Sequence, residues 1–126
     1  MTKQQLTAAA GDVLADRARS RDRAEAPITY GDFAEVLGLE PFKGPDWNNH
    51  PMSRILGQLN AEDNAAGRPF RTALVINGQS RISGPSFFGD LARLRLGDVP
   101  IPEEQWYQFW TEEFTQLLQY HHNRSA

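Results

Sequence analysis

The residues most able to read a nucleic acid lie in one expected helix and in the run that follows it. Arg54 and Gln58 are one helical turn apart, and both side chains can donate hydrogen bonds to base edges or phosphates. Residues 64–89 contain three arginines and no carboxylate, which favours a local positive potential. We therefore expect a DNA-binding surface that includes Arg54, Gln58, Arg71, Gln79 and Arg81.

The same positions also have an ordinary structural interpretation. Arg54 could be held in an ion pair by Asp32 or Glu35, and the other polar residues could be solvent-facing positions of a purely structural domain. The net charge of −3 argues against a strongly basic protein that binds nucleic acid indiscriminately. Both interpretations stay open from the sequence.

An aromatic-rich stripe near the C-terminus is the second candidate surface. Trp106, Tyr107 and Trp110 could bind a protein partner, because Trp and Tyr are enriched at interaction hot spots. Aromatic residues at helical spacing are more often core, and in that case Tyr107, which lies off the main stripe, should face outward. A protein-interaction module is therefore the alternative function.

Nothing in the chain indicates catalysis or a cofactor. There is no cysteine, no nucleophile elbow, no zinc-protease motif and no phosphate-binding loop. The paired glutamates at 103–104 and 112–113 are typical of a helix start and a solvated face, and the three histidines lack ligand spacing. We expect a non-enzymatic protein with no metal and no cofactor.

Length and composition are typical of one small domain. The chain has 126 residues, of which 40% are hydrophobic and 23% are charged. No stretch approaches the ~20 apolar residues of a membrane helix, and the N-terminus lacks the apolar core of a signal peptide. Together with the lack of cysteine, this predicts a cytoplasmic protein with no membrane contact.

The order of expected elements is helix, helix, helix, β-hairpin, helix, helix. Thr2 and Thr29 can cap the first two helices, and Gly38 can end the second. A loop over 40–50 leads to a third helix that begins at Pro51. Asn77-Gly78, between two β-rich runs, predicts a tight hairpin with both turn residues at positive φ.

Three helices followed by a hairpin is the winged-helix order, in which the third helix enters the major groove and the hairpin is the wing. We expect a single α+β domain over 1–126, mostly helical, with an N-terminal helix and arm at 1–26. A winged-helix-like core would span 27–85, and a C-terminal helical pair would span 86–126.

Three short motifs resemble the DNA-binding domain of the alkylguanine-DNA alkyltransferases and alkyltransferase-like proteins. They are Ile-Thr-Tyr-Gly-Asp-Phe-Ala at 28–34, Leu-Gly at 37–38 and Ser-Arg-Ile-Leu-Gly at 53–57. The resemblance implies that Tyr30 perturbs a target phosphate and that Arg54 fills the gap left by a flipped nucleotide. It adds Tyr30 and Ser53 to the expected DNA-binding residues.

The chain departs from that family at the reactive centre. Residues 70–76 lack the Pro-Cys-His-Arg motif, and the absence of cysteine excludes alkyl transfer to a thiol. The spacing from Tyr30 to Arg54 is also longer, because of the loop around residues 44–49. The resemblance covers roughly residues 27–85.

Overall fold

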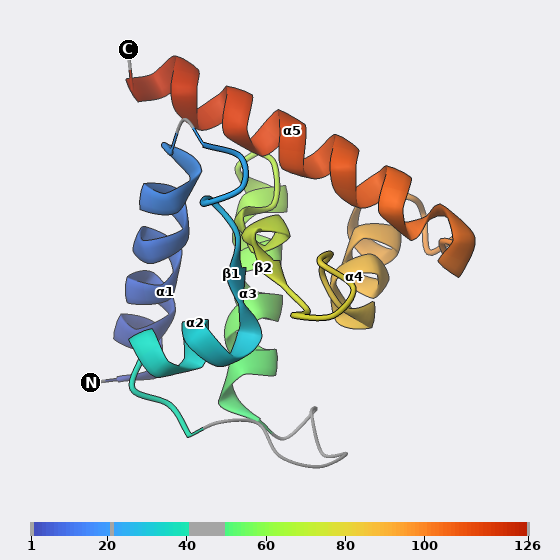
Figure 1. Ribbon diagram of the computed structural model, residues 1–126. Helices are drawn as coiled ribbons and strands as arrows, with labels where there is room; N and C mark the ends of the chain where they lie inside the picture. The colour runs from blue at the N-terminus through green and yellow to red at the C-terminus, as the bar shows by residue number, and fades with distance from the viewer. Residues whose placement is uncertain (1, 21, 41–49, 126) are drawn as a thin grey trace.

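A computed structural model describes residues 2–20, 22–40 and 50–125. This part of the chain is mostly helical, as expected, with two very short strands (Figure 1). Most of the expected loop over 40–50, residues 41–49, lies outside the described residues. No helix in the described ranges is long and apolar enough to cross a membrane. The elements are α1 Lys3–Ala18, β1 Ile28–Thr29, α2 Tyr30–Val36, α3 Pro51–Ala65, η2 Arg71–Leu74, β2 Val75–Ile76, α4 Pro85–Arg95, η3 Glu103–Gln105 and α5 Trp106–Ser125.

The expected helix ends are confirmed where local chemistry sets them. Thr2 and Gln5 form a reciprocal capping box at the start of α1. The Thr29 hydroxyl accepts the Asp32 backbone N–H at 3.2 Å and so caps α2. Gly38 follows α2 with φ 72°, a left-handed conformation that costs glycine little.

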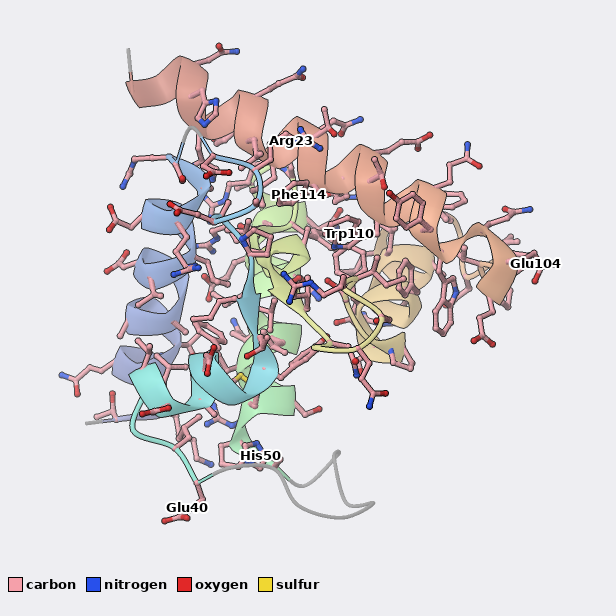
Figure 2. The ribbon with its side chains drawn as sticks, viewed as in Figure 1. Arg23, Glu40, His50, Glu104, Trp110 and Phe114 are labelled. Atoms are coloured by element: carbon pink, nitrogen blue, oxygen red, sulfur yellow. The ribbon has the colours of Figure 1, made fainter. Side chains whose placement is uncertain are left out.

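The core is built around a buried segment, residues 70–76, that crosses the middle of the molecule. Every residue in it is at most 9% exposed. α1, α3 and α5 all contact its η2 turn (Figure 1). Figure 2 shows Trp110 and Phe114 on α5, and Trp110 Nε1 donates to the Ala73 carbonyl at 2.9 Å. The segment is therefore enclosed by helices and not exposed at an edge.

The predicted hairpin is wrong. β2 pairs in parallel with β1, so that Ile28 lies opposite Val75 and Thr29 opposite Ile76. Neither Asn77 nor Gly78 has a positive φ; the left-handed residue of this loop is Arg81, with φ 64°. The chain therefore has no wing of the expected kind after α3.

Local hydrogen bonds explain why the chain does not return as a strand. The Asn77 side chain accepts the backbone N–H groups of Gln79 and Ser80, and its own N–H donates to the Ile82 carbonyl, which closes a compact loop. The Ser83 hydroxyl then donates to the Val75 carbonyl at 2.8 Å. We call residues 77–82 the post-strand loop.

A buried charge cluster fixes the start of the central segment. Asp63, with a side chain 0% exposed, accepts the Arg71 backbone N–H at 2.8 Å, Arg71 Nε at 3.0 Å and Arg68 Nε at 2.6 Å. Glu113 accepts the Phe70 backbone N–H at 2.7 Å and Arg95 Nη1 at 2.6 Å. Both carboxylates are thus neutralised inside the core, as buried charges require.

Gly11 on α1 leaves the space that the Arg71 side chain occupies, which can be tested by substitution. A Cβ at Gly11 would lie 2.5 Å from Arg71 Nη1 and 3.2 Å from Leu59 Cδ2. Alanine gains about 1 kcal/mol over glycine in a helix, but displacing a paired, buried guanidinium costs more. We expect Gly11→Ala to lower the free energy of unfolding by about 1–3 kcal/mol in urea denaturation.

Gly89 provides the matched control for this substitution. It lies within α4, and a Cβ there meets no atom within 4 Å. Gly89→Ala should therefore raise the stability by about 0.5–1 kcal/mol. Equal effects of the two substitutions would contradict the role of Gly11 as the space for Arg71.

His121, on the buried side of α5, generates a prediction about pH. Burial and the nearby charges of Arg19 and Arg71 lower its pKa below the ordinary value. The unfolded chain then binds a proton that the folded chain does not, so stability falls as the pH drops below about 6.5. We expect His121→Gln to flatten the fall in Tm between pH 7.5 and 5.5. His122→Gln controls for loss of an adjacent imidazole, and an unchanged slope in His121→Gln would refute the assignment.

Candidate nucleic-acid interface

The exposed side of α3 separates two openings in the surface. One, which we call the α3–α4 pocket, has a volume of about 280 Å³. The other, the α1–α3 groove, has a volume of about 410 Å³. Ser53 lines the pocket and Arg54, the next residue, lines the groove, so the same helical turn contributes to both.

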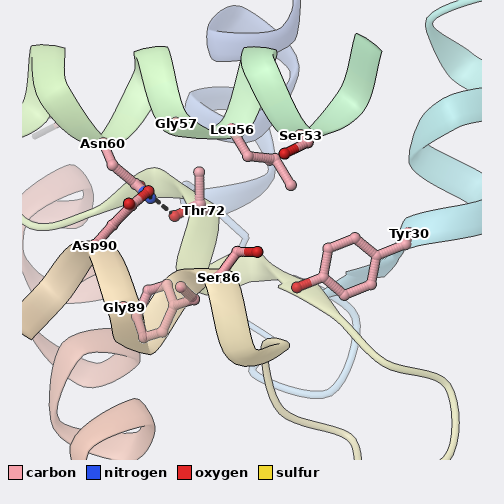
Figure 3. A pocket seen from close by; sticks show the side chains of 10 residues that line it. Tyr30, Ser53, Leu56, Gly57, Asn60, Thr72, Ser86, Gly89 and Asp90 are labelled. Carbon is pink, nitrogen blue, oxygen red and sulfur yellow. Dashed lines mark hydrogen bonds between the residues drawn. The ribbon is translucent and has the colours of Figure 1, made fainter. Parts of the chain in front are cut away.

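The α3–α4 pocket has a polar, hydrogen-bonded interior. Asn60, only 1% exposed, donates from Nδ2 to Asp90 Oδ2 at 2.9 Å and accepts the hydroxyl of Thr72. Figure 3 shows these three side chains meeting at one end of the pocket, with the Tyr30 hydroxyl at the other. These bonds, together with the ion pair from Arg93 to Asp90 Oδ1 at 3.1 Å, hold Asn60 and Asp90 in place on the pocket wall.

Tyr30 is part of the pocket wall. Its hydroxyl oxygen accepts the Gly84 backbone N–H at 2.7 Å, which ties the start of α2 to the chain just before α4. Burial raises the pKa of Tyr30 above its ordinary value, with the Gly84 bond acting in the opposite direction. The phenol is therefore neutral at pH 7 and faces a cavity, which differs from the surface phosphate contact that the family resemblance implies.

The α1–α3 groove contains the two residues expected on one face of α3. Arg54 and Gln58 line it together with Lys3, Gln4 and Glu62. Arg54 is exposed, and among the described residues it forms no ion pair, including none with Asp32 or Glu35. The sequence did not indicate Lys3, which α1 brings beside Arg54 and which adds a second cation to this groove.

Arg71 requires a correction, since we expected it on a DNA-facing surface. Its side chain is only 11% exposed and its guanidinium is paired with Asp63. Gln79 and Arg81 are exposed in the post-strand loop, which connects β2 to α4, and Gln79 lines a hollow together with Glu103 and Glu104. Of the three expected cationic contacts, only Arg54 and Arg81 are available to a ligand.

Most of the aromatic stripe of α5 belongs to the core. Trp110 is 9% exposed, and Trp106 is half-buried, with its ring stacked on Phe88 at 4.6 Å. Tyr107 is 68% exposed, as expected for a residue off the main stripe. The expected partner surface of Trp106, Tyr107 and Trp110 is thereby reduced to Tyr107 and the accessible part of Trp106.

Asn60 and Asp90 were missed by the sequence analysis. A signal for Asn60 did exist, because it continues the buried stripe of α3 one turn after Leu56. A polar residue on an apolar stripe indicates a buried hydrogen bond. For Asp90 there was no such signal, since its partner lies thirty residues earlier and on another helix.

No group of three potential metal ligands occurs among the described residues. Comparisons with protein-family models, with curated proteins and with solved structures each find no match for this chain.

Tyr30→Phe tests whether the phenol anchors the pocket wall. The substitution leaves the Gly84 N–H without its acceptor in a partly buried site, which should cost about 1–3 kcal/mol of stability. Tyr107→Phe removes the same hydroxyl from an exposed side chain and should change stability by less than about 0.5 kcal/mol. Thermal unfolding of both variants measures the difference, and indistinguishable Tm values would show that the Gly84 bond contributes nothing.

Proposed function

We propose that the chain is a non-enzymatic DNA-binding protein that contacts a duplex through the N-terminal half of α3. One observation carries the proposal: Ser53 and Arg54, adjacent on α3, line a polar pocket and an exposed groove respectively, and two cations, Arg54 and Lys3, lie in that groove with one carboxylate, Glu62. A helix that presents such groups on its outer side can enter the major groove. The resemblance of residues 53–57 to the alkyltransferase-like proteins supports the choice of Arg54 on this surface.

Arg54 is the residue to which we assign base or gap recognition. It is exposed, and no described carboxylate pairs with it, so its guanidinium need not break an ion pair in order to bind. Arginine can donate two parallel hydrogen bonds to guanine or stack in the place of an extruded base. Lys3, in the same groove, would contact a phosphate.

The α3–α4 pocket suits a base that has left the stack. It opens beside Ser53, and its wall includes the neutral Tyr30 phenol and the Asp90 carboxylate, which Asn60 and Arg93 hold in place. A carboxylate accepts hydrogen bonds from the exocyclic amino groups of bases. The cost of unstacking, a few kcal/mol, is least for a base that is already unpaired, so we expect a preference for duplexes with an unpaired base.

The post-strand loop takes the place of the expected wing in this proposal. Arg81 is exposed there and would contact the phosphate backbone. Such contacts add affinity without sequence preference. The salt dependence of binding should reflect them.

Arg54→Ala provides the direct test. We expect it to weaken binding to a duplex with one unpaired base by about 1–3 kcal/mol, and Arg81→Ala to lower affinity for all duplexes and to reduce the salt slope by about one. Fluorescence anisotropy from about 50 to 200 mM salt measures both effects. Arg19→Ala removes an exposed charge at the C-terminal end of α1, away from Lys3, and should have no effect.

The pocket is tested separately in the same assay. Asp90→Asn preserves the shape of the side chain but removes its charge; the amide oxygen can still accept from Asn60, and the ion pair with Arg93, at 3.1 Å, is lost. It should reduce the preference for the unpaired base and leave affinity for a matched duplex unchanged. Duplex binding at about 50 mM salt no tighter than that of an unrelated acidic protein of this size would end the proposal.

A further inference from the structure

We propose that a second site, at the opposite end of α3, binds a phosphate group. The site is a hollow of about 350 Å³ lined by Asn64, Gly67, Arg68, Pro69, Arg95 and Gln116, which we call the arginine hollow. Ten residues of helix separate Asn64 from Arg54, or about 15 Å along the axis. The inference therefore goes beyond the DNA-binding surface and does not rest on it.

Both arginines of the hollow are held in place from behind by buried carboxylates. Arg68 Nε donates to Asp63 at 2.6 Å, and Arg95 Nη1 donates to Glu113 at 2.6 Å. The Arg95 guanidinium also lies over the Phe70 ring at 4.1 Å. Side chains fixed in this way lose little conformational entropy when an anion binds, which is the usual benefit of preorganisation.

The arginine hollow retains unused hydrogen-bond donors. Within the described part of the chain, the terminal nitrogens of Arg68 and the Nε of Arg95 make no hydrogen bond, and the two side chains are 29% and 26% exposed. The amides of Asn64 and Gln116 add neutral donors at the edge. An oxyanion placed here would find donors from two guanidinium groups without displacing an existing bond.

The composition of the lining favours an anion. The lining contains two guanidinium groups and no carboxylate. In the cluster behind it, Arg68, Arg71 and Arg95 share two buried carboxylates, and the third acid, Glu62, lies 3.6 Å from Arg71 and is 43% exposed. The guanidinium fork matches the oxygen spacing of a phosphate, so the chemistry points to a phosphate group, either free or in a phosphodiester.

Gln116→Glu tests the site without touching the buried network. Gln116 is exposed on α5, and a carboxylate there would repel an anion in the arginine hollow. We expect inorganic phosphate, at constant ionic strength against chloride, to broaden its ³¹P resonance and to raise the Tm of the wild-type protein saturably. The apparent affinity should fall at least tenfold in Gln116→Glu. Gln119→Glu, an exposed position on the same helix outside the lining, should bind as the wild type does.

Phosphate binding that is absent, or equal in Gln116→Glu and Gln119→Glu, would overturn the proposal. Repeating the titration on Arg54→Ala separates the two sites, because phosphate binding should persist when DNA binding through α3 is lost. A short single-stranded oligonucleotide added to this variant identifies the source of the phosphate. Displacement of inorganic phosphate indicates a phosphodiester ligand, and retention indicates a free anion.

Discussion

The carboxylate of Asp63, fully buried on the inner side of α3, has to be neutralised by partners that the chain itself supplies. Arg71 supplies both its main-chain N–H and its guanidinium, and Arg68 supplies a second guanidinium. These bonds fix the beginning of the central segment against α3, and the position of Arg71 in turn restricts α1 to a glycine at 11. Removing one partner of such a pair leaves an uncompensated buried charge, which typically costs 3–5 kcal/mol.

The geometry of the candidate site follows from the same constraint. Thr72 comes directly after Arg71, and its hydroxyl donates to Asn60 on α3. Asn60 holds Asp90 on α4, so the interior of the α3–α4 pocket is positioned through the central segment. Ser83, bonded to the Val75 carbonyl, then brings Gly84 to the Tyr30 hydroxyl at the far side of the pocket. Core and site are therefore one hydrogen-bonded structure.

The sequence predicted what neighbouring residues decide among themselves. The caps at Thr2 and Thr29 and the left-handed Gly38 depend on contacts within a few positions, and all three are found. A hairpin turn was predicted at Asn77-Gly78, but the Asn77 side chain instead closes a compact loop in which neither residue has a positive φ. The prediction was wrong about which strand pairs with Val75–Ile76. The observed partner, Ile28–Thr29, lies 47 positions earlier in the chain, and turn-forming residues carry no information about such a distant pairing.

The position of the arginines shows why charge patterns along a chain mislead about surfaces. Residues 64–89 lack carboxylates, yet Arg68 and Arg71 are paired with Asp63, which immediately precedes that run. Asp63 lies on the buried stripe of α3 that contains Met52, Ile55, Leu56 and Leu59. A buried carboxylate needs cationic partners, and Arg68 and Arg71 therefore pair with it inside the protein. Arg54 lies outside that stripe and is exposed, so its charge needs no partner within the protein. The helix thus places Asn60 and Asp63 inward near its C-terminal end and Arg54 outward near its N-terminal end, and of these three only Arg54 is exposed to a ligand.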